Sequence, residues 1–296
     1  MAKPWGLSKR YFILGALAVA ILVAAGVLVW WQKSEPTQSQ SSAVLNEVTP
    51  ADVQTAFAQG GDQQTKQNPV AVIMPHHLVA KQLMAEIATV VGQQCPANIV
   101  VLGPDHENRG QTMVTTSATS WQSPWATYDV AADIVQALHA VPFVQTSESV
   151  IAQEHSALYP LPFLQHVCPK ATFVQLIVRS GFDLKKNEQL AQALYTTLKP
   201  EDVVVASVDF SHYKTAAEAR VEDQESLRLL EAGESAALAH IPADAPAVLA
   251  VAMRFAQLRE ASNFQLYKNT NAAEVANDPS QPSTTSYITG WWGRGR

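Results

Sequence analysis

Short apolar runs alternate with longer amphipathic segments along residues 69–296, and this alternation constrains the fold more than any other feature. The runs at residues 70–74, 98–102, 172–178 and 202–208 are almost entirely apolar, as is typical of strands covered on both faces. Segments with helical spacing of apolar residues occur at 78–92, 190–198, 215–231 and 246–260. The sequence therefore predicts an α/β fold with a largely parallel central sheet flanked by helices, closed by strands at 264–267 and 286–291.

A much longer apolar run, at residues 11–31, precedes this region. It contains no charged side chain and ends in Trp30 and Trp31. Its 21 residues match the length of a helix that crosses a bilayer, about 30 Å. Lys3, Lys9 and Arg10 precede it, which predicts that residues 1–10 are cytoplasmic and that the main domain is outside the cytoplasm. We expect a single-pass anchor in the cell membrane; a cleaved secretory signal is the alternative.

Residues 32–68 are rich in Gln, Ser, Thr and Gly, and this composition predicts a flexible linker. Thr49-Pro50 is a helix-start signal within it, so the linker includes a predicted short helix at 50–58. We place the globular domain at 69–296. The net charge of −6 and the pI near 5.7 make the chain a poor candidate for binding nucleic acid.

Histidines follow three of the predicted strands. His76 and His77 come directly after the first strand, and His106 and His212 each follow a later strand by four residues. Because ligands of open α/β sheets bind beyond the carboxyl ends of the strands, these imidazoles are predicted to meet at one edge. Imidazole is a good ligand for first-row divalent metals, so the pattern favours a metal site over a set of unrelated surface histidines.

Four motifs resemble, in order and spacing, those of the Memo-like family, also called AmmeMemoRadiSam system protein B. They are Pro75-His76-His77, the LGPDH segment ending at His106, Glu154-His155-Ser156 with the following LPFL, and the SVDFSH segment ending at His212. The family is similar in structure to class III extradiol ring-cleaving dioxygenases, which hold non-haem Fe(II) with two histidines and a carboxylate.

The resemblance implies roles for individual residues. His76 and His106 match the first two metal ligands, His212 the active-site acid/base and His155 a second pocket histidine. Asp209 matches a carboxylate near His212, where it either orients that imidazole or caps the loop. Glu154 is either a hydrogen-bond partner of a ligand histidine or a surface residue.

The third ligand departs from the family pattern. Memo-like proteins usually have a Cys before a helix in the last third of the chain, but residues 240–246 read HIPADAP. Asp244 is the carboxylate available there. It either completes a set of two histidines and one carboxylate, which suits Fe(II), or caps the helix that begins near Pro246.

Three functional interpretations remain open. The first is a non-haem iron enzyme of the dioxygenase type, in which Fe(II) is favoured over Zn(II) or Cu. The second is a non-catalytic module that binds a small molecule or peptide in the histidine cleft, and the third is a zinc-type metallohydrolase. Cys95 and Cys168 each precede a predicted strand, and in an exported domain they either form a disulfide or remain buried thiols.

Overall fold

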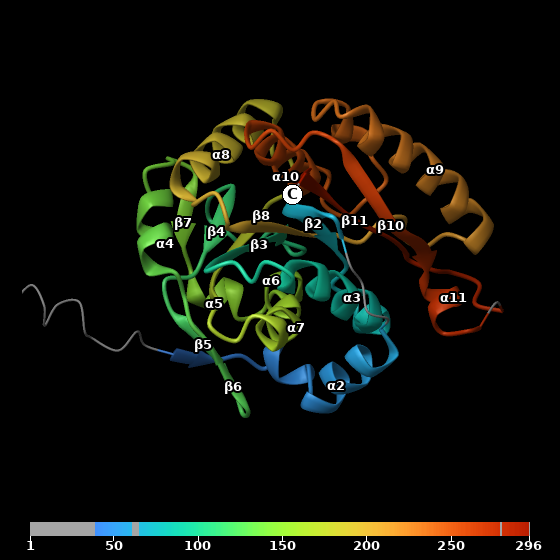
Figure 1. Cartoon of the computed structure of the whole chain (residues 1–296), viewed down its shortest axis with the longest axis horizontal. Helices are drawn as coiled ribbons and strands as arrows, with labels where there is room; N and C mark the ends of the chain where they lie inside the picture. The colour runs from blue at the N-terminus through green and yellow to red at the C-terminus, as the bar shows by residue number, and fades with distance from the viewer. Residues whose placement is uncertain (1–38, 61–64, 279, 296) are drawn as a thin grey trace, which may run out of the picture. The chain divides into compact units, whose positions relative to one another are not determined.

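Four parallel strands lie side by side at the centre of the structure, a computed structural model that describes residues 39–60, 65–278 and 280–295 (Figure 1). In spatial order they are β2 (Gln67–Met74), β9 (Val203–Ser207), β3 (Asn98–Pro104) and β8 (Thr172–Val178). Their side chains are almost all buried, because helices cover both faces of the sheet. The predicted α/β fold with a largely parallel sheet is thus confirmed.

The sheet is mixed at its edges. On one side β11 (Ser286–Gly295) pairs antiparallel with β2, and β10 (Phe264–Asn271) pairs antiparallel with β11. On the other side β4 (Val114–Thr116) is antiparallel to β8 and parallel to β7 (Val144–Thr146). The sheet therefore has eight strands among the described residues, in the order β10-β11-β2-β9-β3-β8-β4-β7.

Helices on the two faces bury separate apolar cores. Val100 and Leu102 of β3 face one core, and Ile99 and Val101 face the other, as the alternation of side chains along a strand requires. The first core includes residues of α4 (Ala132–Leu138), α8 (Leu184–Thr197), α9 (Ala216–Ala232) and α10 (Pro246–Leu258). The second includes residues of α2 (Pro50–Gln59), α3 (Lys81–Gly92), α6 (His155–Leu158) and α7 (Pro160–Val167), on the lower side in Figure 1.

Short elements complete the fold. A second, three-stranded sheet has the order β1-β5-β6. The remaining bounds are β1 (Ser39–Ser41), η1 (Leu45–Glu47), η2 (Leu78–Ala80), β5 (Ser120–Ser123), β6 (Ala126–Tyr128), α5 (Glu148–Ile151), η3 (Ala237–His240) and α11 (Ala272–Val275).

Much of the segment predicted as a flexible linker is ordered. The short helix expected at 50–58 is present as α2, and Thr49 and Asp52 form a capping box at its start. Leu45, Val48 and Ala56 are fully buried in the second core. The linker prediction is therefore wrong for residues 39–59, because their few apolar side chains are spaced to reach that core.

The predicted membrane span at residues 11–31 lies outside the described residues. Within the part of the chain that the structure describes, no helix combines the length and apolar character needed to cross a bilayer.

The structure does not support a disulfide between the two cysteines, which was one of the two alternatives left open by the sequence. Cys95 and Cys168 do lie near the starts of the neighbouring strands β3 and β8, but both are free thiols. Cys95 is exposed, with its Sγ 3.6 Å from the carbonyl oxygen of Val167. Cys168 is enclosed in the second core, and this burial raises the pKa of its thiol.

A buried carboxyl group links α9 to β11. Asp223 is 2% exposed, and its Oδ1 accepts a 2.6 Å hydrogen bond from the hydroxyl of Ser286. Burial raises the pKa of Asp223 to about 6. The folded state therefore binds this proton more tightly than the unfolded state does.

We expect Asp223→Asn to stabilise the protein at pH 7 by about 1–2 kcal/mol, allowing for partial screening. Asp223 lowers the free energy of unfolding as pH rises from about 4 to about 6, and the neutral amide lacks this penalty. Urea unfolding at pH 4 and pH 7 measures the difference, which should nearly vanish at pH 4. Glu231→Gln, an exposed change on the same helix, is the matched control. Equal stability of Asp223→Asn and the wild type at pH 7 would contradict the prediction.

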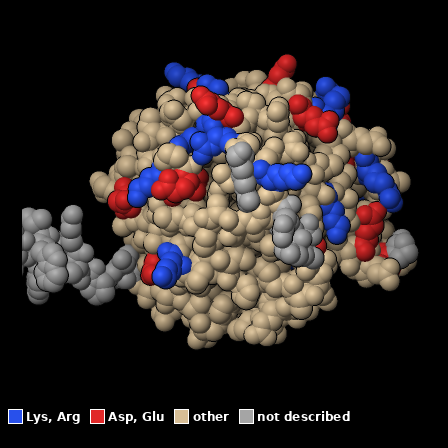
Figure 2. All heavy atoms as spheres, in the orientation of Figure 1, with Lys and Arg blue, Asp and Glu red and all other residues tan. Residues whose placement is uncertain are grey.

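Charged side chains of both signs are mixed over the upper half of the face in Figure 2. Basic groups on that face lie beside acidic ones. Ion pairs among the described residues include Arg254–Glu188 and Lys186–Asp183. Such a face lacks the continuous basic area that a phosphate backbone requires.

Candidate metal centre

The ends of three neighbouring strands position the centre. His76 follows β2 by two residues, Asp209 follows β9 by two, and His106 follows β3 by two. Since β9 lies between β2 and β3 and all three are parallel, the three side chains reach the same edge of the sheet. Pro75 and Pro104 lie at the strand ends, where the lack of an N–H group limits further pairing.

Gly103 allows a fourth segment to approach this edge. A Cβ atom at this position would lie 2.6 Å from Oγ and 2.9 Å from Cβ of Ser156. The hydroxyl of Ser156 also donates a 2.8 Å hydrogen bond to the carbonyl of Pro104. The absence of a side chain at Gly103 thus lets α6 pack directly against β3, which delivers His155 beside His106.

Glu154 orients the loop after β3. Its carboxylate accepts hydrogen bonds from the backbone N–H of His106 at 3.0 Å and from the backbone N–H of Ser156 at 3.0 Å. Its Oε1 also lies 2.8 Å from Nδ1 of His106. Glu154 was predicted to be either a hydrogen-bond partner of a ligand histidine or a surface residue. Its buried side chain and its contact with His106 support the first alternative.

Asp244 lies between two imidazoles. Its Oδ2 is 3.1 Å from Nε2 of His76 and 3.7 Å from Nε2 of His106. The Nδ1 atom of His76 lies 3.2 Å from the hydroxyl of Ser207, so both histidines are fixed at Nδ1 and present Nε2 to the same carboxylate. Asp244 does not cap α10: the N-cap is Ala245, which has no side-chain hydrogen bond.

His155 joins the same cluster. Its ring stacks on that of His106 with a centroid separation of 4.5 Å and an interplanar angle of 13°. One ring nitrogen from each of His76, His106 and His155 lies within 4.8 Å of the others, and the ligand atoms of His76, Asp209 and Asp244 satisfy the same limit. Two overlapping groups of possible ligands therefore share His76.

Asp209 lies between His76 and His77. Its Oδ1 accepts a 3.2 Å hydrogen bond from the backbone N–H of His76, and its Oδ2 lies 3.3 Å from Nδ1 of His77. No hydrogen bond or ion pair between Asp209 and His212 is found among the described residues, so the alternative in which Asp209 orients that imidazole gains no support.

His212 lies outside the central cluster. Its ring centroid is 6.2 Å from that of His77, which in turn has Nδ1 3.2 Å from the hydroxyl of Tyr287. No role was predicted for His77 or Tyr287 from the sequence. His77 is next to a predicted ligand and Tyr287 lies in a predicted closing strand, and neither position has a sequence pattern that indicates a site residue. The pairing of β11 with β2 brings Tyr287 close to His77.

The surroundings of His106 and His155 shift the pKa values of these two imidazoles in opposite directions. Burial lowers the pKa of His106, but hydrogen bonds to Asp244 and Glu154 outweigh it and raise this pKa to about 10. For the same reason the pKa of Glu154 falls to about 2, although burial alone would raise it. Burial and the neighbouring imidazoles lower the pKa of His155 to about 4, so this ring is neutral at pH 7.

The donor set fits a divalent cation. Metal–nitrogen and metal–oxygen bonds of about 2.1 Å place neighbouring ligand atoms roughly 3.0–3.4 Å apart, close to the separations seen at Asp244 Oδ2. Asp244 Oδ1 is buried and accepts no hydrogen bond. A buried carboxylate oxygen without a hydrogen-bond donor is costly unless a cation neutralises it.

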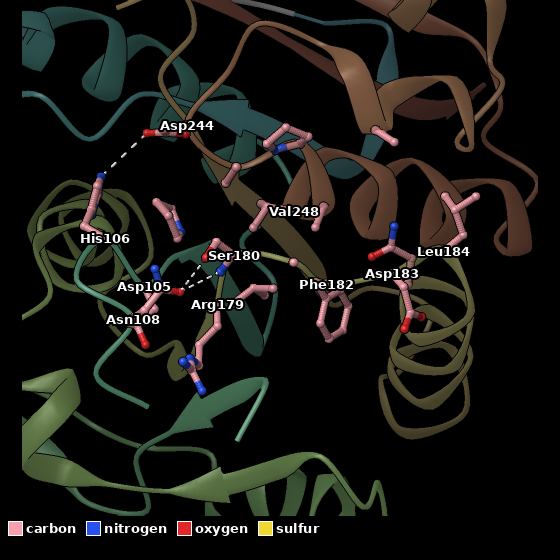
Figure 3. Close-up of a pocket in the computed structure, with 18 residues that line it drawn as sticks. Asp105, His106, Asn108, Arg179, Ser180, Phe182, Asp183, Leu184, Asp244 and Val248 are labelled. Carbon is pink, nitrogen blue, oxygen red and sulfur yellow. Dashed lines mark hydrogen bonds and ion pairs between the residues drawn. The ribbon is translucent and has the colours of Figure 1, made fainter. Parts of the chain in front are cut away.

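A cavity of about 530 Å³ adjoins this centre. His106 and Asp244 line one side of it, and Phe182 and Leu184 line the opposite side, near the start of α8 (Figure 3). A small molecule in this cavity can therefore touch the metal-binding groups.

Comparison with known proteins identifies the family of this chain. The family model described as Memo-like protein matches residues 31–288. A MEMO1 family protein of Aquifex aeolicus is 26% identical over 175 residues, which cover 58% of this chain and 65% of the relative. Another from Methanopyrus kandleri is 26% identical over 202 residues (63% and 69%), and one from Methanosarcina acetivorans is 33% identical over 130 residues (43% and 48%). The chain thus spans about two thirds of the first two relatives and about half of the third.

Proposed function

This chain belongs to the Memo-like family, and on that premise we propose that it is a metal-dependent protein in which His76, His106 and Asp244 hold a divalent cation. One observation carries the proposal: a single carboxylate oxygen of Asp244 faces Nε2 of both histidines. Two imidazoles and one carboxylate leave coordination positions open, which suits Fe(II) and also admits Zn(II) or Cu.

A cation held there supplies Lewis acidity and, if it is iron, one-electron chemistry toward O₂. The protein's own groups supply the rest. We assign to His155, whose ring stacks on that of His106, the role of accepting a proton from a molecule bound there. We assign the role of acid/base for the bound molecule to His212, whose ring centroid lies 6.2 Å from that of His77. A metal centre beside two histidines that handle protons supports a dioxygenase-type or related redox reaction.

Metal reconstitution tests the proposal. The full chain, purified in detergent without a histidine tag, is titrated anaerobically with Fe(II) and separately with Zn(II), and calorimetry measures the stoichiometry. We expect one equivalent of metal per chain. If neither ion binds, the metal centre is refuted and the remaining interpretation is a non-catalytic cleft for a small molecule or peptide. If Zn(II) alone binds, the metallohydrolase interpretation replaces the redox one.

Substitutions distinguish the third ligand from its neighbour. We expect Asp244→Asn to weaken metal binding about tenfold, because the amide lacks the negative charge that offsets the cation. His155→Gln should change the affinity less than threefold if His155 acts on the bound molecule and not on the metal. Calorimetry on the two variants at equal pH measures both changes. If His155→Gln weakens metal binding more than Asp244→Asn does, the third metal ligand is His155 and not Asp244.

The apolar run at residues 11–31 supports anchoring in the cell membrane, with the N-terminus cytoplasmic and the domain extracytoplasmic. Protease treatment of intact cells tests this topology. Degradation of the domain in intact cells is expected, and its protection until the cells are lysed would contradict the proposed orientation.

A further inference from the structure

Arg179 is a basic residue that lines the cavity beside the metal centre. It follows β8 by one residue, and β8 pairs in parallel with β3, so that Val178 lies opposite Pro104. His106 follows Pro104 by two residues. Arg179 and His106 therefore leave the same edge of the sheet from adjacent strands, and both line the cavity.

The side chain of Arg179 has no partner in the part of the chain that the structure describes. No carboxylate there forms an ion pair with it, and its Nε is buried without an acceptor. Only Nε of its three side-chain nitrogens is enclosed in this way, so a ligand would meet the two terminal nitrogens. A guanidinium donates two parallel hydrogen bonds along such an edge, and a carboxylate matches this geometry. Arg179 thus offers an unused binding group for a carboxylate.

The acidic groups of the cavity wall already have partners. Asp183 forms an ion pair with Lys186, and Asp105 accepts hydrogen bonds of 2.9 and 2.8 Å from two backbone N–H groups of its own loop. Asp244 faces the imidazoles of the metal centre. Arg179 is the one lysine or arginine that lines the cavity, so its charge is available to an anionic ligand. A singly charged carboxylate suits this wall better than a phosphate dianion, because three aspartates also line it.

An apolar part of the same wall can receive the carbon frame of such a ligand. Val178, Phe182 and Val248 line the cavity, and all three side chains are at least nine-tenths buried. Apolar walls with a few placed polar groups are typical of sites for small organic molecules. In Figure 3 the side chain of Arg179 extends toward the side of Asn108, away from Phe182. The carboxylate of a bound molecule would therefore lie on the Asn108 side, with its carbon frame against the apolar part.

We propose that Arg179 is a specificity-determining residue that selects a small organic carboxylate whose other end has metal-coordinating oxygen atoms. The carboxylate would pair with the terminal nitrogens of Arg179, and the coordinating oxygen atoms would reach the centre at His106 and Asp244. This inference rests on the proposed metal centre for the second contact and on the cavity alone for the first.

Benzohydroxamates test the proposal, because hydroxamate oxygens chelate divalent metals generally. Probes with a carboxylate or a carboxamide, two groups of nearly the same shape, at ring position 3 or 4 are titrated into the Zn(II)-loaded full chain, with affinity measured by calorimetry. In at least one positional series the carboxylate should bind about tenfold more tightly than the carboxamide. The preference should disappear in Arg179→Met and in Arg179→Gln, the second variant serving if the first does not fold. Arg179→Lys should retain about a threefold preference, because the charge remains but the paired hydrogen bonds are lost.

Arg109→Met is the matched control and should retain the preference. Arg109 is exposed, is hydrogen-bonded to Gln153 and does not line the cavity, so this variant removes the same charge from the neighbouring loop. Equal affinities in both positional series, a preference that survives in Arg179→Met, or an equal loss in the control would overturn the proposal. Failure of the metal centre is recognised separately, because Zn(II) stoichiometry is measured first. Ligand-detected NMR then compares benzoate with benzamide on the metal-free chain, where the preference for benzoate should again depend on Arg179.

Discussion

The doubly substituted chain His76→Ala, His106→Ala is expected to lose metal affinity by at least about a thousandfold. Each imidazole presents Nε2 to Asp244 and is fixed at Nδ1 by a neighbour, so each provides a preoriented ligand. Without both, the remaining carboxylates lack the nitrogen ligands that first-row metals prefer. Anaerobic calorimetry with Fe(II) and Zn(II) measures the loss.

The matched control for this experiment is His139→Ala, His240→Ala. Both residues are exposed, and the side chain of His139 is hydrogen-bonded to Thr146. This variant removes the same number of imidazoles and should bind metal like the wild type. If the control loses as much affinity as the double variant, metal binds at scattered surface histidines and the proposed centre is wrong.

Gly103→Ala is expected to lower the free energy of unfolding by about 2–3 kcal/mol and to weaken metal binding as well. The added Cβ would come within 2.9 Å of the Cβ of Ser156, and neither atom belongs to a flexible side-chain end. To relieve this steric clash, α6 must move away from β3, and this movement displaces His155 and Glu154 from His106. Denaturant unfolding and metal titration of the same preparation measure both effects.

Gly295→Ala is the control for this change, since nothing lies within 4 Å of the position that its added Cβ would occupy. We expect its stability to match the wild type within about 0.5 kcal/mol. A Gly103→Ala chain as stable as this control, with unchanged metal affinity, would mean that α6 adjusts freely and that the close packing does not hold the site.

The centre of the fold could be predicted from sequence because its strands are apolar throughout and its helices are amphipathic. β3 and β8 begin at the first residues of the predicted runs, and α10 begins at Pro246 as its start signal indicated. The short strands β4 and β7 were missed because each has three residues, too few for a periodic pattern. Their placement depends on pairing with β8 and with each other, which no local signal encodes.

The candidate site was predictable to the extent that its residues follow strand ends. His76 and His106 do so, and the structure brings them to one edge together with Asp209, which was predicted from the family resemblance. The neighbours of Asp209 were not predictable, because the choice between His77 and His212 depends on side-chain directions. Tyr287 was not predictable either, because it reaches the site through the pairing of β11 with β2, which no local pattern encodes.

The ordered segment before β2 has a practical consequence for anyone who shortens this chain. A truncation that starts at residue 69 would remove Leu45, Val48 and Ala56 together with the ion pair between Asp52 and Lys81. The apolar surface left open on α3 and α7 would favour aggregation. Shortened versions of the chain should therefore begin before Ser39, the first residue of β1.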